Sequence, residues 1–324
     1  MPTEHGAMTA PPRSNPVSCS IVIPTFDRAA DLERCLSAVS LQEYSPFDVI
    51  VVDNTPGGDA PTLEVSRRWN ATYVREPRRG LCRARNRGAL VSRAEIIAYL
   101  DDDSVPEPLW LSSIAAEFDD PMVMAVGGRT IPLAVETESE KLFAQIRGGA
   151  YNRGTRLVVD RSTPDWFDIC GFGGIGAGCN MAVRRAAFEV WPGFHERTDR
   201  GTAIYGGGEH HAFVSLVSRG FRVTHTPHAV VRHPFPRTMD KLRQRYLRDL
   251  TASTAFFTMM LLEESEYRRL TLRYLLGSIQ GRRRTWRGAS ENKPRIVSRV
   301  RSALALGLGP VRYFQGLLMH NDAS

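Results

Sequence analysis

The sequence is poor in cysteine, and its cysteines are not paired. The 324 residues contain five, without a CxxC motif: Cys19, Cys35, Cys82, Cys170 and Cys179. An odd number without paired spacing argues against a disulfide framework and against a thiolate zinc site. We therefore expect a protein of a reducing compartment.

Long apolar runs are also missing. The longest uncharged apolar stretch, 251–262, is well short of the roughly 20 residues that a membrane-spanning helix needs. Residues 1–16 are rich in proline and lack the apolar core of a signal peptide, so we predict a disordered tail there. These absences argue against an integral membrane protein, and we expect a cytoplasmic one.

Acidic residues are scarce in only one part of the chain. The formal net charge is +7, but residues 265–312 alone carry +10, with 12 Lys and Arg against two acids. Such a basic segment can bind an anionic membrane surface or simply be solvated, and both interpretations stay open. Its aromatic residues are too sparse to stack on single strands, so no nucleic-acid partner is expected. In the membrane interpretation the protein is peripheral on the inner face of the cell membrane.

The residues that are present alternate between strand and helix patterns. Short β-branched runs at 20–24, 47–52 and 96–100 predict buried strands, and helical apolar spacing separates them. This alternation predicts an α/β fold with a mainly parallel, Rossmann-like sheet flanked by helices. Farther along, 183–188 resembles a helix and 222–224 a strand.

The pattern divides the chain into three parts. After the tail at 1–16 we predict an α/β domain at 17–238 and a basic helical C-terminal extension at 239–324. With 42% apolar and 24% charged residues, the chain can bury a substantial core.

Polar residues follow three of the predicted strands. Pro24 and Thr25 close the first, Asp53 ends the second, and the run 101–103, which is Asp-Asp-Asp, follows a later one. Ligands of parallel sheets bind outside the carboxyl ends of the strands, so these residues predict one site. Carboxylates there suit Mg²⁺ or Mn²⁺, which can bridge two phosphates.

Taken together, the motifs resemble those of the family 2 glycosyltransferases, whose fold is of the GT-A type. The matching segments are SIVIPTFDR (20–28), LERCLSAVSLQ (32–42), VIVVDN (49–54), RGLCRARNRGA (79–89), IIAYLDDDSVPEP (96–108), GAGCNMAVRRAAFEVWPGF (176–194), GGGEHHAFVSLVSRGFRV (206–223) and AVVRH (229–233). The likeness covers residues 18–235. Each piece is weak alone, but their order and spacing together are specific.

The resemblance implies a nucleotide-sugar site. Its predicted binding residues are Pro24, Thr25, Asp53, Arg83, Asn86, Asp101, Asp102 and Asn180. Asp101 and Asp103 match the DxD motif, with Asp103 expected to ligate the metal and Asp101 to lie nearer the ribose. His233 matches a histidine that completes the metal site in relatives. Imidazole and carboxylate ligands together suit Mn²⁺.

The sequence departs from the family at the catalytic base. Where the family has Glu-Asp, with the aspartate as general base, this chain has Glu209 and His210, followed by His211. Histidine can accept a proton near neutral pH, so we predict His210 as the base, with Glu209 as the less favoured candidate. The same change could instead mark a lost activity or a different acceptor.

A cluster of histidines raises a second interpretation of the site. His210, His211, His225, His228 and His233 lie within 24 residues, as in some zinc sites. Their spacing matches no standard zinc signature, however, and we expect the pair that flanks Pro227 to face solvent.

The sequence therefore predicts a metal-dependent, inverting glycosyltransferase that uses Mn²⁺ or Mg²⁺. It would move a sugar from a nucleoside-diphosphate sugar to a hydroxyl of a glycan, lipid-linked or small-molecule acceptor. One alternative is a sugar-1-phosphate nucleotidyltransferase, disfavoured because no glycine- and arginine-rich loop follows the first strand. Another is a non-catalytic scaffold that binds sugar nucleotides or glycans.

Overall fold

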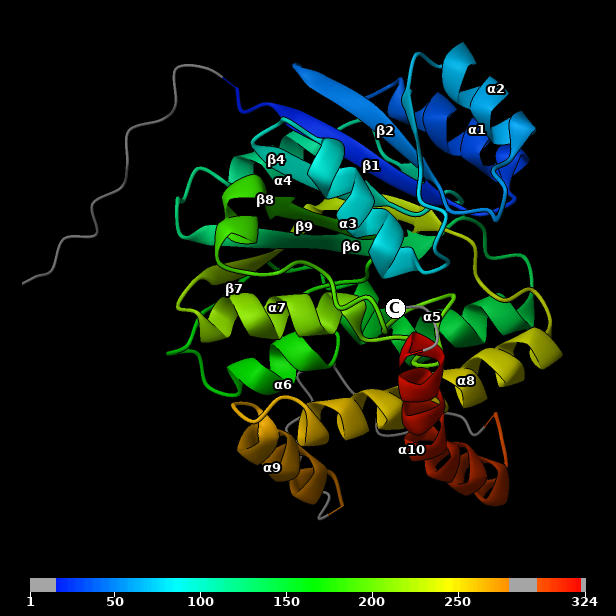
Figure 1. The fold of residues 1–324 in the computed structure, drawn as a ribbon, viewed down its shortest axis with the longest axis vertical. Coiled ribbons are helices and arrows are strands. Elements are labelled where there is room, and N and C mark those ends of the chain that lie inside the picture. The colour runs from blue at the N-terminus through cyan, green and yellow to red at the C-terminus, as the bar shows by residue number, and fades with distance from the viewer. Residues whose placement is uncertain (1–15, 280–295, 322–324) are drawn as a thin grey trace, which may run out of the picture.

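The computed structural model describes residues 16–279 and 296–321 (Figure 1). Its strands are β1 (Cys19–Thr25), β2 (Phe47–Asp53), β3 (Thr72–Arg75), β4 (Ile96–Leu100), β5 (Val105–Pro106), β6 (Val123–Pro132), β7 (Leu157–Val159), β8 (Asn180–Arg184) and β9 (Arg222–His233). They form one sheet in the order β3-β2-β1-β4-β8-β6-β9-β5, and β7 pairs with β9.

The sheet is mostly parallel. Strands β1 to β4 run in one direction, and β8 runs antiparallel to its neighbours β4 and β6. Because β9 is parallel to β6, both share the direction of β1 to β4, while β5 and β7 oppose them. The predicted α/β fold with a mainly parallel sheet is therefore confirmed.

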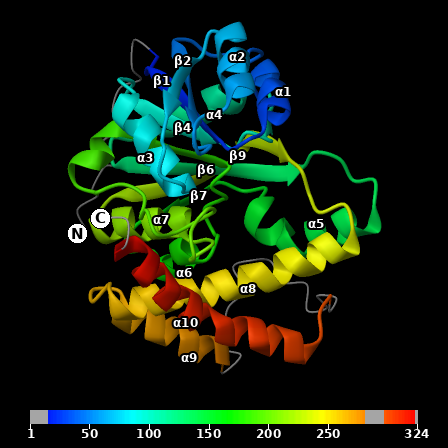
Figure 2. The same ribbon diagram turned by 45° about the vertical axis from the view of Figure 1, so that its right-hand side comes forward.

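Helices cover both faces of the sheet. They are α1 (Ala29–Val39), α2 (Ala60–Arg68), α3 (Leu81–Val91), α4 (Trp110–Glu117), α5 (Glu138–Tyr151), α6 (Trp166–Gly171), α7 (Gly208–Ser218), α8 (Met239–Leu262), α9 (Arg268–Ile279) and α10 (Arg299–Asn321). Helices α1 and α2 lie at one end of the molecule, and α8, α9 and α10 gather at the opposite end, beyond α6 and α7 (Figures 1 and 2).

The strands form two cores because successive side chains point to opposite faces. In β1, Ile21 and Ile23 pack in a core with α1 and α4, whereas Val22 joins the core beneath α3, α6 and α7. The backbone of α3 approaches β1 closely, since a Cβ on Gly88 would lie 2.3 Å from Cγ1 of Val22. This contact requires glycine and fixes α3 against the sheet.

Two sequence predictions in the second half need correction. Residues 183–188, predicted as helix, are the end of β8 followed by a short 3₁₀ helix, Arg185–Glu189. Strand β8 is buried on both faces between β4 and β6, and such a short apolar run lacks the alternation that distinguishes a strand from a helix. The strand predicted at 222–224 is also longer, because β9 passes an irregularity and ends at His233.

The C-terminal helices share a core with the sheet. Phe256 and Met259 of α8, Tyr274 of α9 and Tyr313 of α10 pack in the core that contains α3 and α7. The most basic run of the predicted extension, 282–287, lies outside the described residues, as does most of the predicted tail. Among the helices described here, none has both the length and the apolar character needed to cross a membrane.

Candidate active site at the sheet edge

One edge of the sheet collects polar residues from strands far apart in sequence. Strands β1, β2, β4 and β9 all point their carboxyl ends toward this edge. Thr25, Asp53 and His233 end three of these strands, and Asp101 follows the fourth. The extension of β9 to residue 233 therefore places its histidine beside the aspartates.

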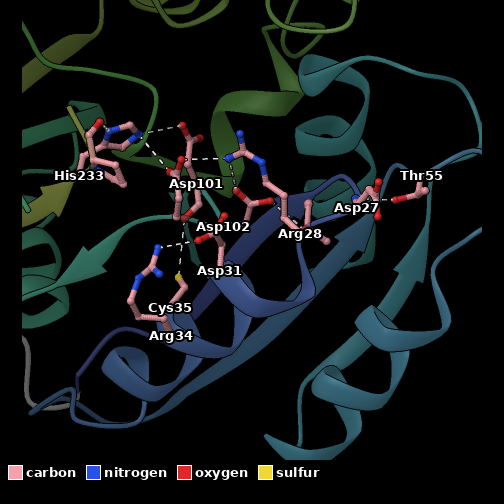
Figure 3. Close-up of polar contacts among 12 residues, drawn as sticks. Asp27, Arg28, Asp31, Arg34, Cys35, Thr55, Asp101, Asp102 and His233 are labelled. Atoms are coloured by element: carbon pink, nitrogen blue, oxygen red, sulfur yellow. Dashed lines mark hydrogen bonds and ion pairs between the residues drawn. The ribbon is translucent and has the colours of Figure 1, made fainter. Parts of the chain in front are cut away.

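The three aspartates after β4 form a buried acidic cluster. Asp101, Asp102 and Asp103 are each at most 9% exposed. The hydroxyl of Thr25 donates to Oδ2 of Asp102 at 2.9 Å, and Nη1 of Arg28 donates to Oδ2 of Asp103 at 3.0 Å. Asp101 and Asp102 lie between Arg28 on one side and His233 on the other (Figure 3).

His233 closes this cluster from β9. Its Nε2 lies 3.1 Å from Oδ1 of Asp103 and 3.8 Å from Oδ2 of Asp101, while its Nδ1 bonds to the carbonyl of Pro234 at 2.9 Å. Burial alone would lower the pKa of His233, but its contacts with the two carboxylates outweigh burial and raise the pKa to about 9. The bond at Nδ1 orients Nε2 toward the carboxylates, as in many metal-binding histidines.

The same contacts keep Asp101 ionised. Burial opposes ionisation, but the contact with His233 and the charges of Arg200 and Arg85 hold the pKa of Asp101 well below its usual range. Its Oδ1 is buried and accepts no hydrogen bond in the part of the chain that the structure describes. Two carboxylates and an imidazole that converge in this way fit Mn²⁺ or Mg²⁺ as ligands.

A cysteine also reaches this group. The ligand atoms of Asp101, Cys179 and His233 all lie within 4.8 Å of one another. Cysteine spacing alone gave no sign of a thiol at the site. Burial raises the pKa of Cys179, so the thiol stays protonated and is a weaker candidate ligand than the carboxylates.

The acidic cluster borders two cavities. The edge cavity, of about 250 Å³, is lined by Pro24, Thr25, Asn54, Arg79, Asp101 and Asp102, among others. The helix cavity, of about 400 Å³, lies toward α8 and is lined by Asp101, Glu209, His210 and His233 together with residues of α8. Asp101, Arg200 and Tyr205 line both cavities, so the two meet at the acidic cluster.

Four residues predicted to bind the nucleotide-sugar line neither cavity. They are Asp53, Arg83, Asn86 and Asn180. Asp53 accepts hydrogen bonds from the amides of Thr55 and Asp59 and from the hydroxyl of Tyr73, at 2.6–2.8 Å. The structure thus assigns Asp53 to the turn after β2.

The other three also have structural partners. Arg83 faces Glu196 at 3.3 Å, and the amide of Asn86 both donates to and accepts from the backbone of Phe194. Asn180 is fully buried, and its amide joins β8 to the indole of Trp110 and to two backbone carbonyls, those of Arg129 and Ala229. Arg83 and Asn86 thus hold the loop that contains Phe194 and Glu196, and Asn180 joins β8 to α4, β6 and β9.

Both candidate bases stand on the first turn of α7. Glu209 and His210 line the helix cavity, whereas the ring of His211 lies 3.0 Å from Oε1 of Glu264, on the α8–α9 connection. Gly207, which precedes the helix, has φ +101°, a conformation that favours glycine. Gly208 packs closely against α3, since a Cβ there would lie 2.5 Å from Sγ of Cys82.

The other histidines do not gather into a zinc site. His225 was expected to face solvent, but it is buried, with its ring nitrogens 2.8 Å and 3.0 Å from the carbonyls of Ile175 and Arg153. His228 is exposed. Within the described residues, only His233 of the five belongs to a group of potential metal ligands.

Sequence reasoning missed a charged network behind the cluster. Arg85 is 2% exposed, and its guanidinium donates to Asp199 at 2.9 Å and to the carbonyl of Gly178 at 3.0 Å and lies 3.6 Å from Asp101. Burial and the charge of Glu209 raise the pKa of Asp199 to about 6. Arg85 belongs to a motif noted in the sequence, but nothing in the sequence pointed to Asp199 or Arg200.

Comparison with known proteins identifies the family. The model of Glycosyl transferase family 2 matches residues 20–191, more than half of the chain. Glycosyltransferase AglE of Haloferax volcanii is 33% identical over 117 residues, which is 34% of this chain and 38% of that protein. The pre-mycofactocin glycosyltransferase of Mycobacterium tuberculosis is 26% identical over 245 residues, 74% of this chain and 45% of that protein. The aligned part is therefore less than half of either relative.

The fold has solved counterparts as well. A mannosyltransferase of Pyrobaculum calidifontis, solved in complex with GDP-Man and Mn²⁺, superposes with a TM-score of 0.55 at 16% identity. The match covers 93% of this chain and 88% of that one. At this identity the likeness shows the GT-A fold and no more. The family match establishes that the chain belongs to Glycosyl transferase family 2.

Proposed function

We propose that this glycosyltransferase moves a sugar from a nucleoside-diphosphate sugar to an acceptor hydroxyl, with a divalent metal and with inversion at the anomeric carbon. The observation that carries the proposal is the buried acidic cluster at the junction of the edge and helix cavities. A donor in the first cavity would meet an acceptor in the second at this point.

The donor would lie in the edge cavity. Pro24, Thr25 and Asn54 would face the nucleoside, with Asp101 nearer the ribose and Asp102 beside it. Asp103 and His233 would hold Mn²⁺ or Mg²⁺, with Asp101 beside them. The bound metal would supply positive charge to the departing diphosphate. The mannosyltransferase of similar fold, solved in complex with GDP-Man and Mn²⁺, supports a nucleotide-sugar and a divalent metal as ligands.

The acceptor would approach from the helix cavity. His210, or less favourably Glu209, would take the proton of the acceptor hydroxyl as its oxygen attacks the anomeric carbon. A single displacement needs one base and inverts the configuration. Both side chains stand on the same helical turn, so the geometry permits either, and variants must separate them.

We predict that Asp103→Asn removes metal-dependent donor binding. The amide keeps the shape of the side chain but loses its charge, so affinity for UDP or GDP in Mn²⁺ should fall at least about tenfold. Isothermal titration measures this, with Glu107→Gln as the control because Glu107 pairs with Arg232 outside both cavities. Unchanged affinity in the Asp103 variant would contradict the metal assignment.

We predict that His210→Ala lowers kcat by roughly 10²–10⁴, the usual contribution of a general base. A histidine base must be unprotonated to accept a proton, so kcat/KM should fall as the pH is lowered. His210→Asp should restore part of kcat and move the acidic fall of kcat/KM, the pH limb, to lower pH.

His211 provides a matched control, because its ring faces Glu264 outside the cavity. We expect His211→Asn to keep kcat and the pH limb. An inactive Glu209→Gln beside a normal His210→Ala would assign the base to Glu209 and overturn the role of His210.

The acceptor can be a glycan, a lipid-linked sugar or a small molecule. An apolar wall in the helix cavity, built by Phe143, Phe235, Leu242 and Phe256, favours an acceptor with an apolar portion. We therefore place a lipid-linked acceptor first.

An exposed surface on the C-terminal helices supports membrane contact. One face of α10 presents apolar side chains that are each at least half exposed: Val300, Leu304, Leu308, Val311, Phe314 and Leu318. Helices α9 and α10 contain exposed arginines and, within their described ranges, neither Asp nor Glu. Such a surface suits the inner, anionic face of a cell membrane. Each basic residue near that face contributes about 1 kcal/mol of binding free energy.

We predict that the protein floats with vesicles containing phosphatidylglycerol and not with vesicles of phosphatidylcholine alone. The double variant Leu304→Glu, Leu308→Glu should abolish flotation, because two charges would enter the apolar face. The control is Leu41→Glu, which is similarly exposed at the end of α1. Equal recovery with both kinds of vesicle, or with neither, would remove the membrane proposal.

A further inference from the structure

Arg200 occupies the junction between the two cavities. It lines both, beside Asp101 and Tyr205. Its backbone is fixed, because its carbonyl accepts a hydrogen bond from the amide of Leu81 at 2.9 Å and the preceding residue, Asp199, is held by Arg85. The side chain therefore extends from an anchored loop into the space where the cavities meet.

Among the residues that the structure describes, the guanidinium of Arg200 has no direct partner. Two other arginines at the site are bound, since Arg28 contacts the acidic cluster and Arg85 contacts Asp199. The side chain of Arg200 forms no hydrogen bond, and no ion pair within 4 Å, in the described ranges 16–279 and 296–321. Arg200 is nevertheless half-buried, so its N–H donors face the cavities instead of a protein acceptor.

Its electrostatic surroundings explain why an unpaired cation is tolerated. Burial disfavours the charge, but Asp101, Asp103 and Asp199 lie near enough to raise the pKa of Arg200 above its ordinary value. These carboxylates hold the cation at the junction, while the N–H donors remain available to a ligand. The ligand of matching chemistry is an anion with several oxygens, because the planar fork of arginine pairs with phosphate in a bidentate manner.

We propose that Arg200 binds the diphosphate of the donor, an inference that rests on the proposed function above. The diphosphate would have to lie beside the acidic cluster, and Arg200 is the cation that faces both cavities there without a partner among the described residues. The nucleoside, at the β1 and β2 ends of the edge cavity, and the acceptor, toward α8, would lie on either side of it.

This position matters in the transfer step. The acceptor oxygen forms a bond to the anomeric carbon as the bond from that carbon to the β-phosphate oxygen breaks. The electron pair of the broken bond stays on the diphosphate, and the acceptor proton passes to the base on α7. The leaving group thus gains negative charge at the junction, where the guanidinium of Arg200 would stabilise it.

The test compares nucleoside diphosphates with monophosphates. Affinities of UDP, UMP, GDP and GMP, each with Mn²⁺, are measured by isothermal titration for the wild type, Arg200→Ala, Arg200→Lys and the exposed control Arg93→Ala. If circular dichroism shows that Arg200→Ala has a lower melting temperature than the wild type, Arg200→Gln is used in its place. We expect Arg200→Ala to lose about 10- to 100-fold in affinity for the diphosphate that binds, as for a charged hydrogen bond. Its affinity for the corresponding monophosphate should change by less than about twofold, and lysine should restore part of the loss.

Two results would overturn the inference. In the first, Arg200→Ala lowers the affinity for the diphosphate and for the monophosphate equally; in the second, it lowers neither affinity. In both, Asp103→Asn still abolishes metal-dependent binding. Arg200 would then not bind the second phosphate, and the proposed function would stand. If the wild type binds none of the four nucleotides, the proposed function fails, and this inference fails with it.

Discussion

The burial of three consecutive carboxylates at the end of β4 is the constraint on which the site depends. Desolvating such charges is costly unless cations compensate for them. The nearby cations come from distant parts of the chain: Arg28 before α1, Arg85 on α3, Arg200 before α7 and His233 at the end of β9. The order of the strands brings these cations to the carboxylates. The cations in turn offset the cost of burying the carboxylates.

This arrangement also separates the proposed donor site from the proposed acceptor site. The parallel strands β1, β2 and β4 end beside the edge cavity, and α7 starts beside the helix cavity. Arg85 and Asp199 connect the two regions through a buried ion pair of 2.9 Å. The candidate metal ligands and the candidate bases are therefore held in a fixed relation, which the proposed transfer between two bound substrates needs.

Much of the first half could be predicted from the sequence because local signals agree there. Compact β-branched runs mark β1, β2 and β4, and the aspartates that follow β4 are adjacent in sequence. The glycosyltransferase family was also recognised from such ordered motifs, and the family match confirms it. The assignment of the metal ligands and of the base stays a prediction.

Other features depend on tertiary context that no short segment encodes. Strand β8 shows no alternation because it is buried on both faces, and β9 continues past an irregularity that conceals its length. Asn180 and Asp53 match family motifs, yet here both lie outside the cavities. The amide of Asn180 bonds to α4, β6 and β9, and the carboxylate of Asp53 bonds to the turn after β2. The importance of Asp199 and Arg200 follows from what surrounds them in space, and a single sequence does not show this.

The position of the metal distinguishes the proposed site from any other. Crystals grown with Mn²⁺ and a nucleoside diphosphate would be measured at the manganese absorption edge, where anomalous scattering locates the ion independently of any assumed ligand. We predict a single strong peak among the carboxylates of Asp101 and Asp103 and the Nε2 atom of His233, next to the diphosphate. A nucleotide bound in the edge cavity with no manganese peak at these residues would contradict the proposed metal site.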